Sequence, residues 1–251
     1  GLTLFNKDDF IIKKPELGDL TYLKIDRKFS EETLTAFLPY IDTVREKGRR
    51  FVNIGFPYKI PGKEGLAGFE LVNHSYKGHA KGSQRKYSVW IANFAPAPQL
   101  VKDIFIAESA MDAMSFYQLY KGKYNFGHSV FISTGGSVLK NQVLNVLRAY
   151  PNSKINTLFD NDFSGKMYDI YLASIKEKRE VAIRKNKDSV SFEMKKGIFN
   201  ISMDEISLAR FERITGIRSG VRAYKAKGKD FNEMLQNRNV VAERTINTFK
   251  R

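Results

Sequence analysis

Beyond residue 102, short apolar runs alternate with longer segments whose apolar residues recur at helical spacing, and this pattern constrains the fold most strongly. Buried strands are predicted for the apolar runs at 103–107, 129–133 and 155–159. Helices are predicted between and after them, at 111–120, 138–150 and 167–178, and a candidate fourth strand at 180–184. Repeated strand–helix units predict an α/β fold, with a parallel central sheet covered by helices on both faces. Ligands of such sheets bind at the carboxyl ends of the strands.

The N-terminal part of the chain has a different pattern. Ser30, followed by two glutamates, predicts the start of a helix that Pro39 should end or kink. Alternating residues at 41–45 and 51–56, on either side of a turn at Gly48, predict a β-hairpin. We therefore expect a small, β-rich α+β subdomain before the parallel sheet.

The prolines within 93–99 indicate a linker, after two further expected strands at 65–72 and 86–92. We divide the chain into an N-terminal subdomain (1–98), an α/β core (99–185) and a basic C-terminal extension that completes the core (186–251). In the extension a strand is expected at 190–194, and helices at 204–215 and 240–249.

Composition excludes several kinds of chemistry. The chain has no cysteine, which rules out disulfides, thiolate zinc sites and cysteine nucleophiles. It has three histidines; we interpret His74 and His79 as surface residues and assign no role to His128. The apolar runs are shorter than a membrane span requires, so we expect a cytoplasmic protein that does not enter membranes. A net charge of +15 favours a polyanionic partner.

Acidic residues follow the first and third predicted strands of the α/β core. Glu108 comes directly after the first strand, and Asp160 and Asp162 come directly after the third. Parallel strands could bring these three carboxylates together, and an all-oxygen site of this kind suits Mg²⁺ or Mn²⁺. Capping of the next helix is the alternative for the aspartates, and Asp162 in particular is a plausible N-cap.

The order of these motifs resembles the Toprim domain shared by bacterial primases, type IA and type II topoisomerases, and some nucleases. The resemblance rests on IAESAMDAMS at 106–115, STGG at 133–136 and LFDNDFSGK at 158–166. It implies that Glu108 acts as a general acid or base or joins the acidic site, and that Asp160 and Asp162 bind Mg²⁺. Asp112 then matches a supporting acid. Ser109 departs from the family, which often has glycine after the glutamate.

The likeness extends to both sides of this core. Segments IGFP at 54–57, GFEL at 68–71 and RKY at 85–87 are similar to the subdomain that precedes Toprim in primases. GKDFNE at 228–233 resembles a signature of primase-like proteins of mobile elements. It makes Asp230 a candidate fourth metal-site acid, with helix capping as the alternative. The long separation of Asp162 from Asp230 indicates an insertion near 186–220.

Basic residues near these motifs are candidates for nucleic-acid binding: Arg49, Arg50, Arg85, Lys86 and Lys166. Cations in such loops can hold phosphates without reading sequence, and Tyr87 and Trp90 could stack on unpaired bases. The alternative is a solvated surface for the cations and, favoured for Trp90, a place in the core.

Taken together, the resemblance implies a primase-like, metal-dependent nucleotidyltransferase acting on single-stranded DNA with nucleoside triphosphates. The expected partner in DNA replication is a helicase or another replication protein. Two alternatives remain open: a Toprim nuclease that cleaves phosphodiesters with the same carboxylates, and a non-catalytic DNA-binding module of a mobile element.

Overall fold

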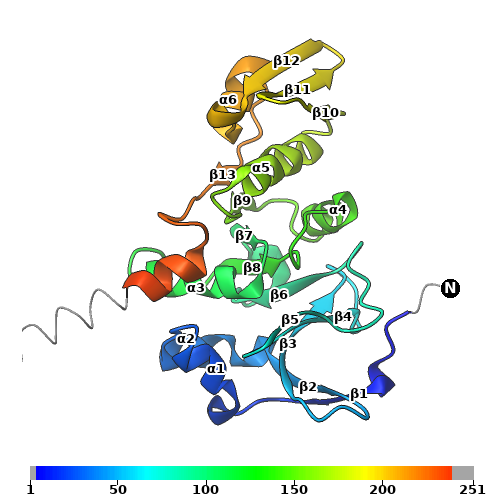
Figure 1. Ribbon diagram of the computed structural model, residues 1–251, viewed down its shortest axis with the longest axis vertical. Coiled ribbons are helices and arrows are strands. Elements are labelled where there is room, and N and C mark those ends of the chain that lie inside the picture. The colour runs from blue at the N-terminus through cyan, green and yellow to red at the C-terminus, as the bar shows by residue number, and fades with distance from the viewer. Residues whose placement is uncertain (1–3, 239–251) are drawn as a thin grey trace, which may run out of the picture.

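Four parallel strands form the centre of the protein, in the order β8, β7, β9 and β13 (Figure 1). Three of them match the predicted apolar runs: β7 (Asp103–Ala107), β8 (Ser129–Ser133) and β9 (Lys154–Thr157). The fourth, β13 (Arg222–Ala223), was not expected, because two exposed residues leave no apolar pattern to find. The computed structural model describes residues 4–238, and every structural statement below concerns these residues.

Helices cover both faces of this parallel sheet, as predicted. Phe105 and Ala107 of β7 pack in one hydrophobic cluster together with α3 (Ala110–Tyr120). Ile104 and Ile106 face the other way and pack in a second cluster with three helices from later in the chain. These are α4 (Lys140–Ala149), α5 (Phe163–Lys176) and α6 (Leu208–Thr215). The alternation along β7 therefore divides the core in two.

The N-terminal strands continue the same sheet. The predicted hairpin is present as β2 (Asp42–Glu46) and β3 (Asn53–Lys59), which pair antiparallel. The other strands of this part are β1 (Phe10–Lys13), β4 (Gly68–Asn73), β5 (Tyr76–His79) and β6 (Val89–Asn93). β6 pairs antiparallel with β8, so ten strands form one sheet that continues across the expected domain boundary between residues 98 and 99. The division into domains remains a prediction.

Strand β3 is the point at which this sheet branches. One edge of β3 pairs with β2 through residues 53–55 and then with β6 through residues 58–59. β4 pairs with β3 through residues 54–58. Pro57 lies between residues 53–55, which pair with β2, and residues 58–59, which pair with β6. Proline has no N–H to donate, and at this gap in the pairing its absence removes no hydrogen bond to either strand. The branch lets β4 and β5 extend toward the ends of the parallel strands.

Short helices pack beneath the N-terminal strands. They are α1 (Thr21–Ile25) and α2 (Glu31–Phe37), with 3₁₀ turns at Lys7–Asp9, Leu17–Leu20 and Leu38–Tyr40. Two further 3₁₀ turns come later in the chain, at Pro98–Leu100 and Met203–Glu205. The hydroxyl of Ser30 accepts a hydrogen bond from the Thr33 N–H and caps α2, as predicted. Pro39 falls in the 3₁₀ turn that ends α2, which confirms the predicted helix stop.

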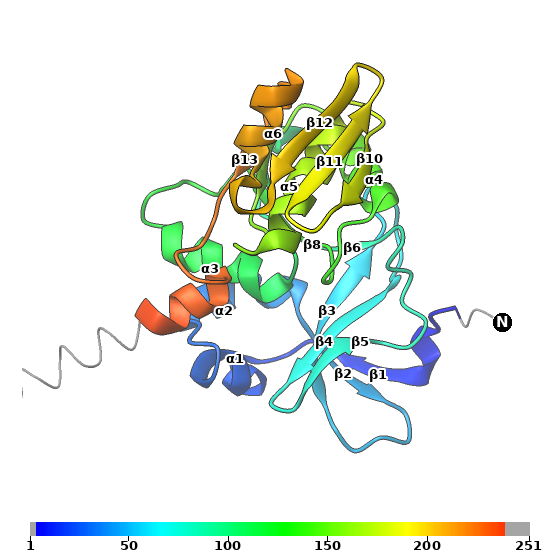
Figure 2. The same cartoon turned by 45° about the horizontal axis from the view of Figure 1, so that its top comes forward.

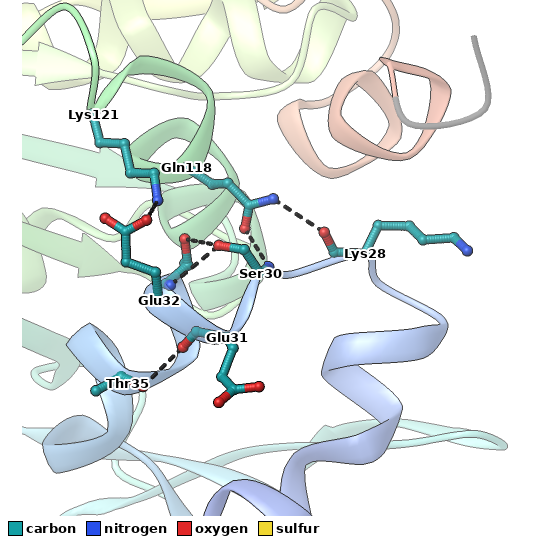
Figure 3. A network of polar contacts seen from close by, with 8 residues as sticks. Lys28, Ser30, Glu31, Glu32, Thr35, Gln118 and Lys121 are labelled. Carbon is teal, nitrogen blue, oxygen red and sulfur yellow. Dashed lines mark hydrogen bonds and ion pairs between the residues drawn. The ribbon is translucent and has the colours of Figure 1, made fainter. Parts of the chain in front are cut away.

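Polar contacts tie α2 to α3, the helix that begins just after Glu108 (Figure 3). The Ser30 N–H donates to Gln118 Oε1 over 2.8 Å, and Gln118 Nε2 donates to the Lys28 carbonyl over 3.1 Å. Lys121 forms an ion pair with Glu32. These contacts link the N-terminal helices to the element that follows the first candidate site residue.

The candidate fourth strand at 180–184 does not join the parallel sheet, so this expectation was wrong. Instead β10 (Ala182–Lys185) forms a separate antiparallel sheet with β11 (Ser189–Met194) and β12 (Gly197–Ser202). All four residues of β10 are exposed, which a strand buried within the parallel sheet could not be. This small sheet and α6 lie beyond α5, at the end of the molecule away from β1 and β2 (Figures 1 and 2).

The chain returns from this module through β13 and ends the described part in a helical segment at 231–238. Phe231 and Leu235 of this segment are buried in the same cluster as α3. The predicted helix at 240–249 lies outside the described residues.

Trp90 provides a test of this fold, because it lies in β6, which joins the two parts of the sheet. Its side chain is fully buried, and its Nε1 donates to the Tyr40 carbonyl over 2.8 Å. We expect Trp90→Ala to lower the free energy of unfolding by about 3–5 kcal/mol. Phe51→Ala should change it by about 0.5 kcal/mol or less, because Phe51 is 77% exposed. Urea denaturation checks both, and equal effects would contradict the described packing.

Candidate active site

Glu108 and Asp160 lie together at the carboxyl ends of neighbouring parallel strands. β7 ends one residue before Glu108, and β9 ends three residues before Asp160. The Asp160 N–H donates to Glu108 Oε1 over 3.2 Å. The Gly136 N–H, from the turn after β8, donates to the Glu108 carbonyl over 2.7 Å. The parallel pairing thus brings together two of the three acids that were singled out in the sequence.

Two further acids reach the same place from helix N-termini. Asp112, in the first turn of α3, is buried, and its carboxylate bonds to the Ser109 hydroxyl and accepts the Asn232 N–H over 3.2 Å. Asp230 accepts the Glu233 N–H over 2.7 Å and so caps the last described helix. Asp230 therefore makes the capping contact that we considered as its alternative, while it also lines the same cavity as Asp112.

This cavity has a volume of about 350 Å³. Its acidic lining residues are Glu70, Glu108, Asp112, Asp160 and Asp230. The other lining residues are Lys77, Gly78, His79, Ser109, Gly135, Gly136 and Lys229. A pocket with five carboxyl groups and two lysines suits a ligand that carries both a cation and anionic groups.

Burial and the repulsion between neighbouring carboxylates disfavour the charged forms of Glu108, Asp112 and Asp160. Burial, together with the negative charges of Asp160, Asp162 and Asp112, raises the pKa of Glu108 to about 7, against the lowering effect of the hydrogen bond from the Asp160 N–H. Burial, and then Asp230, raise the pKa of Asp160 and also that of Asp112. A divalent cation would relieve this repulsion, so the chemistry of the oxygen donors fits Mg²⁺ or Mn²⁺.

The acids are not already arranged as the ligands of one ion. Between residues 4 and 238, no three acidic or histidine side chains converge as a ready-made metal site. Asp162 is exposed, does not line the cavity, and accepts the Gly165 N–H over 2.8 Å as the N-cap of α5. Asp162 thus makes the capping contact foreseen as its alternative, and its role as a metal ligand stays a prediction.

Gly165 lets the start of α5 approach Asp160 closely. A Cβ at residue 165 would lie 2.1 Å from the Asp160 carbonyl oxygen and 2.8 Å from its carbonyl carbon. Any side chain at this position would push against the backbone that carries a candidate site residue. The glycine of the FSGK segment therefore has a packing role that its sequence context did not specify.

Glu70 was not predicted as a site residue, although it lies deep in the cavity wall. It comes from β4 in the N-terminal part and is 2% exposed. Its Oε2 accepts the Ser133 hydroxyl over 2.9 Å and the Ala110 N–H over 3.3 Å, whereas Oε1 is buried without a partner. Burial raises its pKa. Two signals were available in the sequence: a charged residue inside a largely apolar strand, and its place in the GFEL segment that resembles the primase subdomain.

His79 is not a surface residue, so that interpretation was wrong. β5 pairs with β4 so that His79 lies opposite Glu70, and its Nδ1 is 3.0 Å from the Tyr58 hydroxyl. Burial lowers the pKa of His79 to about 4, and the positive charges of Arg85 and Lys77 contribute. β5 was not predicted, because its polar sequence lacks the apolar alternation typical of a strand. His74 is exposed, as expected, and its Nδ1 lies 3.5 Å from Asp26 Oδ2.

The predicted nucleic-acid-binding residues lie in different surroundings. Arg49 and Arg50 are exposed in the loop between β2 and β3, and Lys86 is exposed beside Tyr87. Lys166 is half-buried in α5. None of these four lines the cavity around Glu108.

Arg85 contacts a loop that lines the cavity instead of facing open solvent. Its guanidinium donates to the Gly135 carbonyl over 2.9 Å and to the Ser137 hydroxyl over 3.0 Å. This contact ties the N-terminal part to the glycine turn after β8. Trp90 is in the core, the favoured interpretation.

Comparison with known proteins finds one matching family model and similar solved structures. Residues 105–192 match a family model described as Toprim-like. The primase fragment of the bacteriophage T7 primase-helicase protein has a similar structure, with a TM-score of 0.51 and 15% sequence identity, over 93% of this chain and 74% of that fragment. Residues 105–192 therefore form a Toprim-like domain, in a chain whose fold is similar to that of the T7 primase fragment.

A second similar structure comes from the bacteriophage T7 lagging-strand DNA polymerase interacting with primase domains bound to an RNA/DNA hybrid and dTTP. Its TM-score is 0.44 at 16% identity, over 70% of this chain and 81% of that chain. No curated protein matches the sequence. None of the described helices is long and apolar enough to cross a membrane.

Gly165→Ala tests the close approach of α5 to Asp160. We expect a loss of about 1–3 kcal/mol in the free energy of unfolding, because the new methyl group overpacks against backbone atoms. Gly122→Ala is the matched control, since a Cβ there meets no atom within 4 Å. Thermal unfolding of both variants measures the difference, and a fully stable Gly165→Ala protein would contradict the described approach.

The environment of His79 predicts a specific pH dependence. NMR titration should show His79 neutral down to about pH 5, with a midpoint near 4. Because the folded pKa is below the ordinary value of 6.5, unfolding binds protons, and the contribution of His79 to stability is lost as the pH falls from 6.5 toward 4.

Acids with raised pKa values have the opposite effect on stability as the pH falls. The pH dependence of the free energy of unfolding should therefore be compared between the unaltered protein and His79→Asn. The variant should lose less stability between pH 6.5 and 4 than the unaltered chain. A His79 midpoint near 6.5 would refute the buried environment.

Proposed function

We propose that this protein is a primase-like nucleotidyltransferase that uses single-stranded DNA as template and nucleoside triphosphates as substrates. One observation carries the proposal: a chain with a primase-like fold over nearly its whole length has a cavity lined by acids from the ends of its parallel strands. The Toprim-like match spans β7 to β11, the region that supplies Glu108 and Asp160. The net charge of +15 suits a nucleic-acid substrate.

In the proposed reaction the 3′-hydroxyl oxygen of one nucleotide bonds to the α-phosphorus of the next. The bond from that phosphorus to the leaving pyrophosphate breaks. Bound Mg²⁺ or Mn²⁺ would neutralise phosphate charge and favour deprotonation of the hydroxyl. Asp160 and Asp162 would hold the metal, with Glu108 and Asp230 as further ligands, and Lys77 and Lys229 lie in or beside the same cavity to meet phosphate oxygens.

The exposed cations at Arg49, Arg50 and Lys86 would hold the template through its phosphates, and Lys166 lies in the first turns of α5. Such contacts give an affinity that falls steeply with salt and does not need the metal. Arg85 would act indirectly, because its guanidinium is engaged with the glycine turn.

The T7 neighbour is a fragment of a primase-helicase protein. By analogy we propose that this chain works with a helicase or another replication protein, in the cytoplasm, in replication of DNA such as a mobile element.

Substitution of the acids tests the reaction. We expect Asp160→Asn, Asp162→Asn and Glu108→Gln each to reduce metal-dependent oligonucleotide synthesis by at least about a hundredfold, because even outer partners of metal ligands cost 10–100-fold. Asn caps helices as well as Asp does, so a loss in Asp162→Asn would report the missing charge and not a missing cap. Asp188→Asn, at an exposed acid between β10 and β11, is the matched control.

The measurement is incubation with single-stranded DNA, labelled nucleotides and Mg²⁺ or Mn²⁺. New oligonucleotides that the acid variants fail to make would support the primase. Shortened DNA without synthesis would replace it with a nuclease. No product, with salt-sensitive binding that persists in chelator, would identify a DNA-binding module.

A further inference from the structure

The backbone around Asp160 is held from the side of β13 by a lysine. Lys225 Nζ donates to the Phe159 carbonyl and to the Asp160 carbonyl, each over 3.1 Å. Both carbonyls belong to the loop that follows β9 and precedes α5. An ammonium group that bonds two successive carbonyls fixes the direction in which this loop leaves the sheet. The position of the Asp160 carboxylate therefore depends on how this loop is held.

The charge of Lys225 is balanced away from the cavity. Its Nζ lies 2.7 Å from Asp169 Oδ2, and the Asp169 side chain is 1% exposed. Thr157 Oγ1 donates to Asp169 Oδ1 over 2.5 Å, so both carboxylate oxygens have partners. The acidic partner comes from α5 and the hydroxyl from β9. Lys225 therefore brings hydrogen-bond donors close to the acidic cavity while its charge is paired elsewhere.

The segment that carries Lys225 forms backbone hydrogen bonds both before and after Asp160. The Tyr224 N–H donates to the Thr157 carbonyl over 2.8 Å, which continues the pairing of β13 with β9. The Asn161 N–H donates to the Lys229 carbonyl over 2.7 Å, and Asn161 Nδ2 donates to the Ala226 carbonyl over 3.2 Å. This returning segment thus contacts the residues on either side of Asp160 and then supplies Asp230.

We propose that Lys225, paired with Asp169, is a positioning residue that holds the Asp160 carboxylate in place for the divalent cation. The inference rests on the proposed metal-dependent function. It concerns a residue that itself does not line the cavity. The contacts of Lys225 are with the backbone of Asp160, and its effect on a bound cation is transmitted through that backbone.

Two physical effects predict opposite outcomes when Lys225 is changed to methionine. Simple Coulomb attraction predicts tighter cation binding, because a positive charge disappears near the site and leaves Asp169 without its partner. Loss of positioning predicts weaker binding, because two backbone carbonyls lose their donor and the loop is freed. The sign of the change therefore separates a positioning role from a purely electrostatic one.

The experiment measures Mn²⁺ affinity of the full chain by isothermal titration and by electron paramagnetic resonance. We expect Lys225→Met to bind Mn²⁺ about 10–100-fold more weakly, the range known for outer partners of metal ligands. Lys225→Arg, which keeps the charge and the donors, should be closer to the unaltered protein. Binding of single-stranded DNA in chelator should change little, because Lys225 does not lie among the proposed template contacts.

Lys176→Met is the matched control. Lys176 also donates to a backbone carbonyl, that of Ser219, and pairs with the neighbouring Glu177, but it lies at the far end of α5. Its substitution should leave Mn²⁺ affinity unchanged. If Lys225→Met fails to fold, Lys225→Met combined with Asp169→Asn removes both charges and provides the same comparison.

The outcomes are distinct. A folded Lys225→Met protein, or the folded double variant, that binds Mn²⁺ as tightly as the unaltered chain or more tightly would overturn the positioning role. An unaltered chain that binds no Mn²⁺ would instead refute the metal site of the proposed function. Weaker binding in Lys225→Met with normal binding in Lys176→Met is the expected result.

Discussion

Repulsion among partly buried carboxyl groups is the constraint around which the candidate site is organised. Glu108, Asp112, Asp160 and Asp230 line one small cavity, and burial together with neighbouring charge raises the pKa of the first three. Backbone N–H groups of Asp160, Asn232 and Glu233 bond to the carboxylates of Glu108, Asp112 and Asp230, and Lys225 bonds to the backbone of Asp160. These donors lie in the loop after β9 and in the segment that follows β13.

Local sequence patterns were sufficient to predict the parallel core, whereas Asp112 and Asp230 were added to the candidate acids by the family resemblance. The runs that became β7 and β8 each have a continuous apolar centre, and the end of β7 places Glu108 at the carboxyl edge of the sheet. Residues that depend on distant pairing could not be found in this way. β5 is polar and β13 has two exposed residues, so neither gives a pattern, and the roles of His79 and Lys225 depend on those strands.

The inserted module shows how the site tolerates a long detour of the chain. After α5 the backbone builds β10, β11, β12 and α6, then returns to pair with β9 through β13. Because Asn161 and Thr157 bond directly to the returning segment, the position of Asp230 is set by that pairing and not by the length of the module. The position of Asp230 in the cavity is therefore independent of its wide sequence separation from Asp162.

Continuity of the sheet makes the cavity a joint product of both parts of the chain. β6 pairs with β8, and the branch at β3 carries β4 and β5 toward the carboxyl ends of the parallel strands. Glu70 thereby bonds to Ser133 and Ala110, and Arg85 bonds to the turn at Gly135. A parallel core alone would leave this wall of the cavity open, with the Ala110 N–H and the Ser133 hydroxyl deprived of their Glu70 acceptor. The N-terminal strands are therefore part of the site itself, beyond any contact they make with a template.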